Sequence, residues 1–452
     1  MRGEGSKLAD MAYLTGEARE QVTMFPVTLD ELIPEEHVCR VIEAFVNRLE
    51  MGKLGFVRSE PAETGRPGYD PRDLLKLYLY GYMNQLRSSR RLEAECQRNV
   101  EVMWLLGRLR PDYKSIAEFR RMHREGVKEA GAELVRLARE VGLVRGEWVA
   151  IDGSKFRAVS SAARVKEREG LQRYLDEMEA ADAREDVVID HSAVQAALEK
   201  LKNDPEPEAR FMRTTEGKRP AYNVQTAVDA ECGIIVAHAV TTETNDTRSL
   251  LPMAKAAKQA VGNPESLHVV ADAGYSNGEQ AAQCEAQGIA PHVPANRGTN
   301  TRGDGTLFVG AEFHYDEASD TMVCPAGERL RRQQVQAARR QVVYVGEASV
   351  CGVCPLRVRC TTASRRVVKR HLYEGALGRM QQRATAEAMR LRRCVVERPF
   401  AELKYRIFGH PRFLLRGAGG AQTEISLATM TYNLKRMMRV LGGASLRAVL
   451  AS

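Results

Sequence analysis

Two aspartates stand in nearly the same local setting. Asp152 follows the apolar run 149–151 and precedes a glycine, and Asp272 follows the run 269–271 with a glycine two positions later. Both patterns predict a buried strand whose C-terminal end carries a carboxylate, which is where open α/β sheets place their active sites. A single strand-end aspartate often does no more than cap a following helix. Two of them favour a pair of carboxylates that binds a metal ion.

A third carboxylate is expected from another element, because neighbouring carboxylates repel each other unless a cation lies between them. Such oxygen ligands suit Mg²⁺ or Mn²⁺, which bind through a few carboxylates, water and substrate phosphate. Glu397 is the first candidate and Glu402 the second. At 3.6 residues per turn, Arg393, Glu397 and Lys404 share one helix face, although spacing alone fits an exposed ion pair even better. Pro399 predicts a kink or a helix break just after Glu397.

Four of the nine cysteines follow one another with the spacing C-x26-C-x2-C-x5-C. A CxxC pair with further cysteines nearby is typical of zinc sites, in which short loops supply four thiolates to a tetrahedral ion. We expect a structural zinc ion here or, as the alternative, reduced thiols without metal. The chain has no HxxxH or HExxH pattern and no Walker A loop, so we expect no histidine metal site and no ATP. The four residues are Cys324, Cys351, Cys354 and Cys360.

Short runs of strand-forming residues predict that the two aspartates lie in one sheet. They predict three strands, a helix and a fourth strand, with a hairpin turn at 231–233 between the second and third strands. Asp246 is expected to cap the helix. An acidic, alanine-rich segment at 158–219 predicts exposed helices, and the chain from about 376 onward is expected to be helical, with a break at the glycines 417–420. The predicted strands are 148–151, 222–228, 234–240 and 267–271, and the helix is 247–260.

The region 25–145 has helical periodicity. Asp70 and Pro71 predict one helix start, and Ser115 with Glu118 predicts a capping box that starts a helix running to about residue 141. A plain helical bundle and a DNA-binding domain are both compatible with this pattern. The arginines of this region tilt the balance toward DNA, and the candidates for DNA contacts are Arg90, Arg91, Arg120 and Arg121.

Length and composition limit the class of protein. The 452 residues suit two or three domains, at roughly 100–200 residues each. No apolar run approaches the roughly 18 residues that span a bilayer, and the first residues lack the apolar core of a signal peptide, so we expect a cytoplasmic protein. Residues 324–416 contain 21 Lys and Arg against 6 Asp and Glu. This net charge of +15, set against +8 for the whole chain, indicates a polyanionic partner such as nucleic acid.

With these residues in place, the chain resembles bacterial insertion-sequence transposases of the DDE superfamily from about residue 25 to 441. The segments AIDGSKF, VVADAGYSN and CVVERPFAELK resemble the three catalytic motifs in order, and GRPGYDPRDLLKLYLYGYMNQLRSSRRLEAECQRNVEVMWLLG resembles an InsH-type N-terminal domain. Related transposases carry Tyr, Arg, Glu and Lys separated by two, three and six residues. Arg393, Glu397 and Lys404 match this pattern, whereas Arg390 stands in place of the Tyr.

The resemblance implies an α/β fold, with an RNase H-like catalytic core (a mixed sheet with flanking helices), an all-α N-terminal DNA-binding domain and a Cys-rich insertion. Asp152, Asp272 and Glu397 would be catalytic and would bind two Mg²⁺ or Mn²⁺ ions for strand cleavage and strand transfer. Arg393 and Lys404 would contact DNA phosphates. The implied division is a tail at 1–24, the helical domain at 25–146, the catalytic domain at 147–441 with insertions at 158–219 and 293–375, and a tail at 442–452.

The implied partners are the terminal inverted repeats of the element and its target DNA, bound by a homodimer on paired ends. The protein would be nucleoid-associated when bound to DNA, with no membrane and no ATP involved. Two other functions remain open on the sequence. One is a DNA-binding regulator that has lost catalysis, and the other is an RNase H-like nuclease without strand transfer. Metal-dependent nicking and capture of target DNA separate the three.

Overall fold

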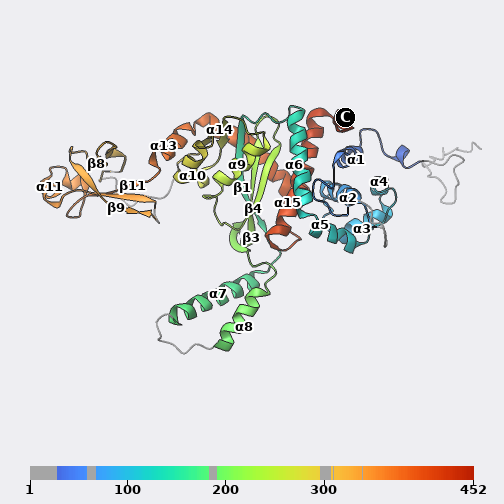
Figure 1. Cartoon of the computed structure of the whole chain (residues 1–452), viewed down its shortest axis with the longest axis horizontal. Coiled ribbons are helices and arrows are strands. Elements are labelled where there is room, and N and C mark those ends of the chain that lie inside the picture. Colours follow the sequence, from blue (N-terminus) through green and yellow to red (C-terminus); the bar gives the residue numbers. More distant parts are fainter. Residues whose placement is uncertain are drawn as a thin grey trace, which may run out of the picture.

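The structure is a computed structural model that describes residues 28–58, 68–182, 191–295, 307–308, 310–337 and 340–451. The tail predicted at 1–24 lies outside these residues. In Figure 1 the N-terminal helices and a small second sheet lie at opposite ends of the molecule. A helical pair projects from the central sheet between them. No helix in the described part of the chain is long and apolar enough to cross a membrane.

A six-stranded mixed sheet forms the centre of the molecule. β1 pairs antiparallel with β3 on one side and parallel with β5 on the other, and β6 extends the parallel edge. β2 and β4 both pair with β3, whose residues 220–229 are all buried. This sheet with flanking helices confirms the predicted α/β class and agrees with an RNase H-like core. The strands are β1 (Trp148–Arg157), β2 (Arg210–Thr214), β3 (Gly217–Asp229), β4 (Ile235–Thr241), β5 (Leu267–Val270) and β6 (Ile289–His292).

The first strand is longer than predicted. The apolar run suggested an end at residue 151, but β1 continues to Arg157 because β3 offers antiparallel partners along its whole length. Asp152 therefore lies within the strand, opposite Thr226, and not at its tip. On the other edge of β1, Trp148 pairs with His268 and Ala150 with Val270. Continued by two residues, this constant offset places Asp152 beside Asp272.

Helices cover both faces of the sheet. α9 packs against β3 and β4, α14 against β1, and the long α15 against β4 and α6. α14 continues through Pro399 and ends at Ala401, followed by a π-helical turn at 402–407, so the predicted break after Glu397 is wrong. The glycines at 417–420 start α15 instead of interrupting it. The helices are α9 (Leu250–Ala260), α10 (Gly278–Glu285), α13 (Glu374–Arg383), α14 (Ala386–Ala401) and α15 (Gly417–Leu441).

The N-terminal region is helical, as predicted. Asp70 caps α2 by accepting the Arg72 N–H, with Pro71 at the first position. The predicted capping box at Ser115 is wrong, because Asp112 caps α5 three residues earlier and α5 ends at His123, where α6 begins. The helices are α1 (Val38–Arg48), α2 (Pro71–Met83), α3 (Ser89–Arg98), α4 (Val100–Leu105), α5 (Tyr113–Met122) and α6 (Arg124–Glu140). The predicted C-terminal tail forms a further helix, α16 (Gly443–Ala451), against α1.

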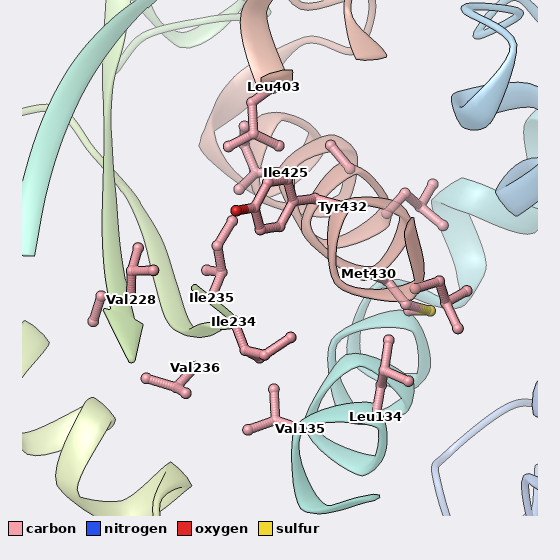
Figure 2. Close-up of a cluster of buried hydrophobic side chains, with 14 of the residues drawn as sticks. Leu134, Val135, Val228, Ile234, Ile235, Val236, Leu403, Ile425, Met430 and Tyr432 are labelled. Atoms are coloured by element: carbon pink, nitrogen blue, oxygen red, sulfur yellow. The ribbon is translucent and has the colours of Figure 1, made fainter. Parts of the chain in front are cut away.

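One hydrophobic core joins the N-terminal helices to the sheet. Figure 2 shows Leu134 and Val135 of α6, Ile235 of β4, and Met430 and Tyr432 of α15 packed in one cluster. Because a continuous apolar interface removes the freedom of two bodies to move separately, we expect these helices to move with the catalytic sheet.

A buried ion pair adds a polar link at the same junction. Glu424 of α15 is fully buried and accepts from Arg87 at 2.9 Å. Its other oxygen accepts the backbone N–H groups of Leu414 and Leu415 at 2.6 and 2.7 Å. A buried charge is stable only when it is paired and hydrogen-bonded in this way. Glu424 therefore fixes the α2–α3 region to α15 and the loop that precedes it.

Two additions extend from the core. α7 (Ala162–Asp182) and α8 (His191–Lys202) form the helical pair of the acidic segment. A five-stranded antiparallel sheet, in the order β11-β10-β9-β8-β7, forms within the Cys-rich segment, where the sequence predicted no strands. Its elements are β7 (His314–Asp316), β8 (Thr321–Val323), β9 (Arg329–Gln336), β10 (Gln341–Val345), α11 (Ala348–Val353), α12 (Arg357–Cys360) and β11 (Val367–His371).

Candidate active site

The two aspartates singled out by the sequence come together on neighbouring strands. Asp152 projects from β1 with a side chain 22% exposed, and Asp272 lies two residues after β5 with a side chain 47% exposed. The Asp272 carboxylate accepts the Gly274 N–H at 2.8 Å, which orients it at the start of a short turn. A Cβ at Gly274 would lie 3.0 Å from Asp272 Oδ1, so a glycine leaves room for the carboxylate at this turn.

An arginine lies between the two carboxylates. Arg392 of α14 donates from Nη2 to Asp152 Oδ1 at 2.9 Å, and the same nitrogen lies 3.6 Å from Asp272 Oδ2. No sequence pattern indicates this contact, because Arg392 is one residue away from Arg393, the arginine that matches the family spacing. Its guanidinium occupies the position between the carboxylates that a cation is expected to fill. Two carboxylates that share one cationic partner can also bind a divalent metal ion, because such ions prefer oxygen ligands.

The surroundings of Asp152 disfavour the charged form of its carboxylate unless a cation lies nearby. Burial raises the pKa of Asp152 to about 6, while the charge of Arg392 and the Gly153 N–H act in the opposite direction. Asp272 and Asp246 raise it further by repulsion. Lys404 lies near the same carboxylate: burial lowers the pKa of its ammonium and the charge of Asp152 opposes that shift.

Glu397 is not in contact with the aspartates. It lies on α14 five residues after Arg392, which is about 7.5 Å along the helix axis and about 140° around it, and its side chain is exposed. No hydrogen bond or ion pair joins it to Asp152 or Asp272 among the described residues. Arg393, one position after Arg392, is exposed as well. The site therefore brings Asp152, Asp272 and Lys404 together and does not include Glu397.

The second-choice carboxylate is committed elsewhere. Glu402 forms ion pairs with Arg439 at 3.3 Å and Arg398 at 3.7 Å, and only 13% of its side chain is exposed. Because a buried carboxylate with two cationic partners is already neutralised, Glu402 is not available to a metal ion at Asp152. Glu397 remains the third carboxylate that the sequence motif indicates.

A polar network around Asp246 supports β1 next to the aspartate pair. Asp246 accepts from Asn223 at 2.6 Å, Gln225 at 2.7 Å and Lys155 at 3.3 Å, all through Oδ1. The prediction that Asp246 caps α9 is wrong, since Ser249 is the cap residue. The network was missed because single polar residues in β3 look like exposed positions, whereas Asn223 and Gln225 are fully buried.

Gly153 is required by this network. A Cβ at this position would lie 2.3 Å from Gln225 Nε2, 2.8 Å from Asp246 Oδ1 and 3.0 Å from Tyr275 Oη. Tyr275 is itself bound to Gln225, so the three groups cannot move independently. The glycine after Asp152 therefore lets polar side chains pack directly beneath the catalytic strand.

The arginines predicted to contact DNA divide into two groups. Arg90, Arg91 and Arg121 are exposed, the last in an ion pair with Glu118. Arg120 is only 4% exposed, because its guanidinium lies 4.8 Å from the centre of the Tyr78 ring and donates to the Arg87 carbonyl. A buried guanidinium cannot reach a phosphate, so Arg120 is a structural residue.

Other groups with ligand chemistry lie outside this site. Cys324, Cys351, Cys354 and Cys360 are all free and line one cavity in the small sheet. Among the described residues, His37, Cys39 and Glu101 offer three ligand atoms within 4.8 Å of one another. That group sits at the N-terminal ends of α1 and α4, where the positive ends of the helix dipoles disfavour a cation. Outside the quartet, Cys39, Cys96 and Cys284 are buried, Cys232 is partly buried and Cys394 is exposed.

Comparison with known proteins agrees with the geometry. Residues 27–122 match the family model described as "Transposase domain (DUF772)", and residues 181–434 match the one described as "Transposase DDE domain". No curated protein and no solved structure matches the chain significantly. The second match covers more than half of the 452 residues and includes Asp272, Arg392 and Glu397. DDE transposases are DNA-binding enzymes that catalyse DNA transposition and typically use divalent metal ions. The chain belongs to the DDE transposase family.

Proposed function

We propose that this transposase binds the terminal inverted repeats of its own insertion sequence and catalyses both strand cleavage and strand transfer. The observation that supports the proposal is the pair Asp152 and Asp272, held side by side on β1 and β5 and bridged by one cationic group. Two strands of a rigid sheet keep the carboxylates at a fixed separation. Fixed ligands of this kind are what phosphoryl transfer requires, since its catalysis is largely positioning and charge stabilisation.

Asp152, Asp272 and Glu397 are the proposed ligands of two Mg²⁺ or Mn²⁺ ions. When bound, these ions activate the attacking hydroxyl and stabilise the leaving oxygen of an in-line displacement. Arg392 would have to leave its position between the aspartates for an ion to bind there, because both cannot use the same oxygens. Glu397 is exposed and free of ion pairs among the described contacts, so its carboxylate would be open to such an ion.

Cationic side chains around the pair hold the DNA backbone. Lys404 is partly buried next to Asp152, with Nζ 5.9 Å from the centre of the Phe156 ring. Arg393 is exposed on the same helix as Glu397. We assign both to phosphates next to the scissile bond, where charge-assisted hydrogen bonds are strongest. Arg90, Arg91 and Arg121 are the proposed contacts of the N-terminal helices with the inverted repeats, in a dimer that holds two ends.

The experiment that tests the proposal uses purified protein and DNA that carries one end of the element. Asp152→Asn, Asp272→Asn and Glu397→Gln should each lower Mg²⁺-dependent cleavage by at least 100-fold, since each removes one charge from the metal ligands, while DNA binding in a gel-shift assay stays near wild type. Glu387→Gln is the matched control, because Glu387 is an exposed carboxylate of the same helix.

Three outcomes distinguish the functions that the sequence left open. Cleaved ends joined to target DNA support transposition. Cleavage without joined products indicates a nuclease, and binding without any metal-dependent cleavage by the wild type indicates a non-catalytic regulator. If Glu397→Gln cleaves DNA at the wild-type rate, Glu397 is not part of the site. The aspartate pair is called into question only if Asp152→Asn also cleaves DNA.

A further inference from the structure

The four clustered cysteines surround one cavity in the small antiparallel sheet. The cavity has a volume of about 560 Å³ and is lined by the ends of β8 and β9 on one side and by α11 and α12 on the other. All four thiols are free and partly exposed toward it. The transposition chemistry proposed above makes no use of them. Their arrangement therefore calls for a separate role.

Two tight turns present the sulfurs. At the first, the Gly327 N–H donates to the Cys324 carbonyl at 2.8 Å, and Gly327 has the positive φ of +82° that such a turn favours in glycine. At the second, the Arg357 N–H donates to the Cys354 carbonyl at 3.1 Å. In both turns a proline directly follows the cysteine, and proline pre-sets the backbone for this position. Each turn thus holds a cysteine at a defined position on the cavity wall.

The other two cysteines complete the set. Cys351 lies on α11 three residues before Cys354, and Cys360 ends α12. Both residues line the same cavity as Cys324 and Cys354, so the four thiols face one space. Four thiols from two segments, with one CxxC pair, form the ligand set of a tetrahedral zinc site.

The charge around the cavity suits such a site. A zinc ion bound by four thiolates carries a net charge of about −2. The cavity wall contains four arginines and only two glutamates. Cations near a thiol favour the thiolate, which is the form that binds metal. The arginines are Arg329, Arg331, Arg357 and Arg366.

The small sheet also has little else to hold it together. Its core consists of seven buried side chains, and Cys324 and Cys360 pack at the edge of that core. β9 is exposed at six of its eight positions. A unit of this size seldom folds firmly on its hydrophobic core alone, and small domains commonly add disulfides or a metal. The seven residues are Phe308, Phe313, Met322, Leu330, Val342, Tyr344 and Val368.

We propose that Cys324, Cys351, Cys354 and Cys360 bind one structural zinc ion that fixes α11 and α12 to the small sheet. In the described structure no three of these sulfurs lie within 4.8 Å of one another, whereas Zn–S bonds of about 2.3 Å place tetrahedral ligands about 3.8 Å apart. Zinc binding thus draws the segment 351–360 toward Cys324 and closes the cavity.

The test measures zinc in the full-length protein purified under reducing conditions. We expect about one equivalent of zinc in the wild type and less than about a tenth in the double variant Cys351→Ser, Cys354→Ser. Cys394→Ser is the matched control, because Cys394 is an exposed free cysteine outside the quartet, and it should retain zinc. Asp152→Asn should retain zinc too, which separates this site from the proposed catalytic metals.

Co²⁺ titration of the zinc-free wild type keeps the proposal testable if the double variant fails to fold. Thiolate-to-cobalt charge-transfer absorption of a tetrahedral site should appear and reach a plateau at one equivalent. Limited proteolysis should show slower cleavage within 348–360 when zinc is present. Less than half an equivalent of zinc, cobalt bound without thiolate absorption, or a mass decrease showing disulfides in the protein as purified would each overturn the proposal.

Discussion

Arg392 offers a direct way to examine the aspartate pair. Replacing it with alanine removes the only side chain that contacts both Asp152 and Asp272 among the described residues. Arg392 lowers the pKa of Asp152, which is about 6 with Arg392 in place, and Asp272 raises it, so removing the guanidinium leaves the repulsion between the two carboxylates less compensated. The variant should be less stable than the wild type without metal, and divalent metal should restore it.

The size of the effect follows from the exposure of the groups. Removing one partner of a fully buried ion pair costs about 3–5 kcal/mol. Asp152 is 22% and Asp272 47% exposed, so solvent screens part of the charge and we expect about 2 kcal/mol. For a chain of this length that corresponds to about 2 °C in Tm. In the wild type, a bound metal ion must also displace the Arg392 guanidinium from Asp152. Losing this charged hydrogen bond, worth about 1.5 kcal/mol, weakens metal binding about tenfold.

Thermal unfolding and isothermal titration with Mn²⁺ at pH 7.5 measure both quantities. Arg392→Ala should have the lower Tm in EDTA, the larger rise in Tm with Mn²⁺ and the tighter Mn²⁺ binding. Arg393→Ala, the neighbouring exposed arginine, should match the wild type in all three. If Arg392→Ala and the wild type have equal Tm in EDTA and equal Mn²⁺ affinity, Arg392 does not occupy the metal position and the reasoning fails.

Two further predictions concern stability and support of the site. Burial lowers the pKa of His238 to about 4, so its contribution to stability is complete above pH 6.5 and falls by about 3 kcal/mol as the pH drops toward 4. In urea unfolding at pH 7, 5.5 and 4.5, the free energy of unfolding of His238→Asn should therefore fall less with decreasing pH than that of the wild type. An equal fall in both proteins would show that His238 is not the group responsible. Gly153→Ala should lower cleavage at least tenfold because its Cβ meets Gln225 and Asp246, whereas Gly170→Ala, with open space around it, should cleave normally.

The sequence predicted the parts of the fold that depend on local pattern. The apolar runs before Asp152 and Asp272 identify buried strands because such runs have few other stable arrangements. The helix that starts after Asp70 is set by a cap and a proline within three residues. Local signals of this kind need no knowledge of the rest of the chain.

Features that depend on tertiary contacts were not predictable. β9 has the sequence RLRRQQVQ, whose polar residues show no clear alternation of apolar and polar positions. It forms a strand only because β8 and β10 pair with it. The apolar periodicity continues across His123, so the break between α5 and α6 left no signal. Arg392 and Arg393 are equivalent in sequence, and only the docking of α14 on β1 decides which of them turns inward.

The most direct test of the aspartate pair as the metal site is anomalous scattering from crystals of the full chain grown with Mn²⁺. The account predicts a manganese peak within ligand distance of both Asp152 and Asp272, with the Arg392 guanidinium moved away from its 2.9 Å contact. Saturating Mn²⁺ with no peak at these carboxylates, and with Arg392 still between them, would contradict it.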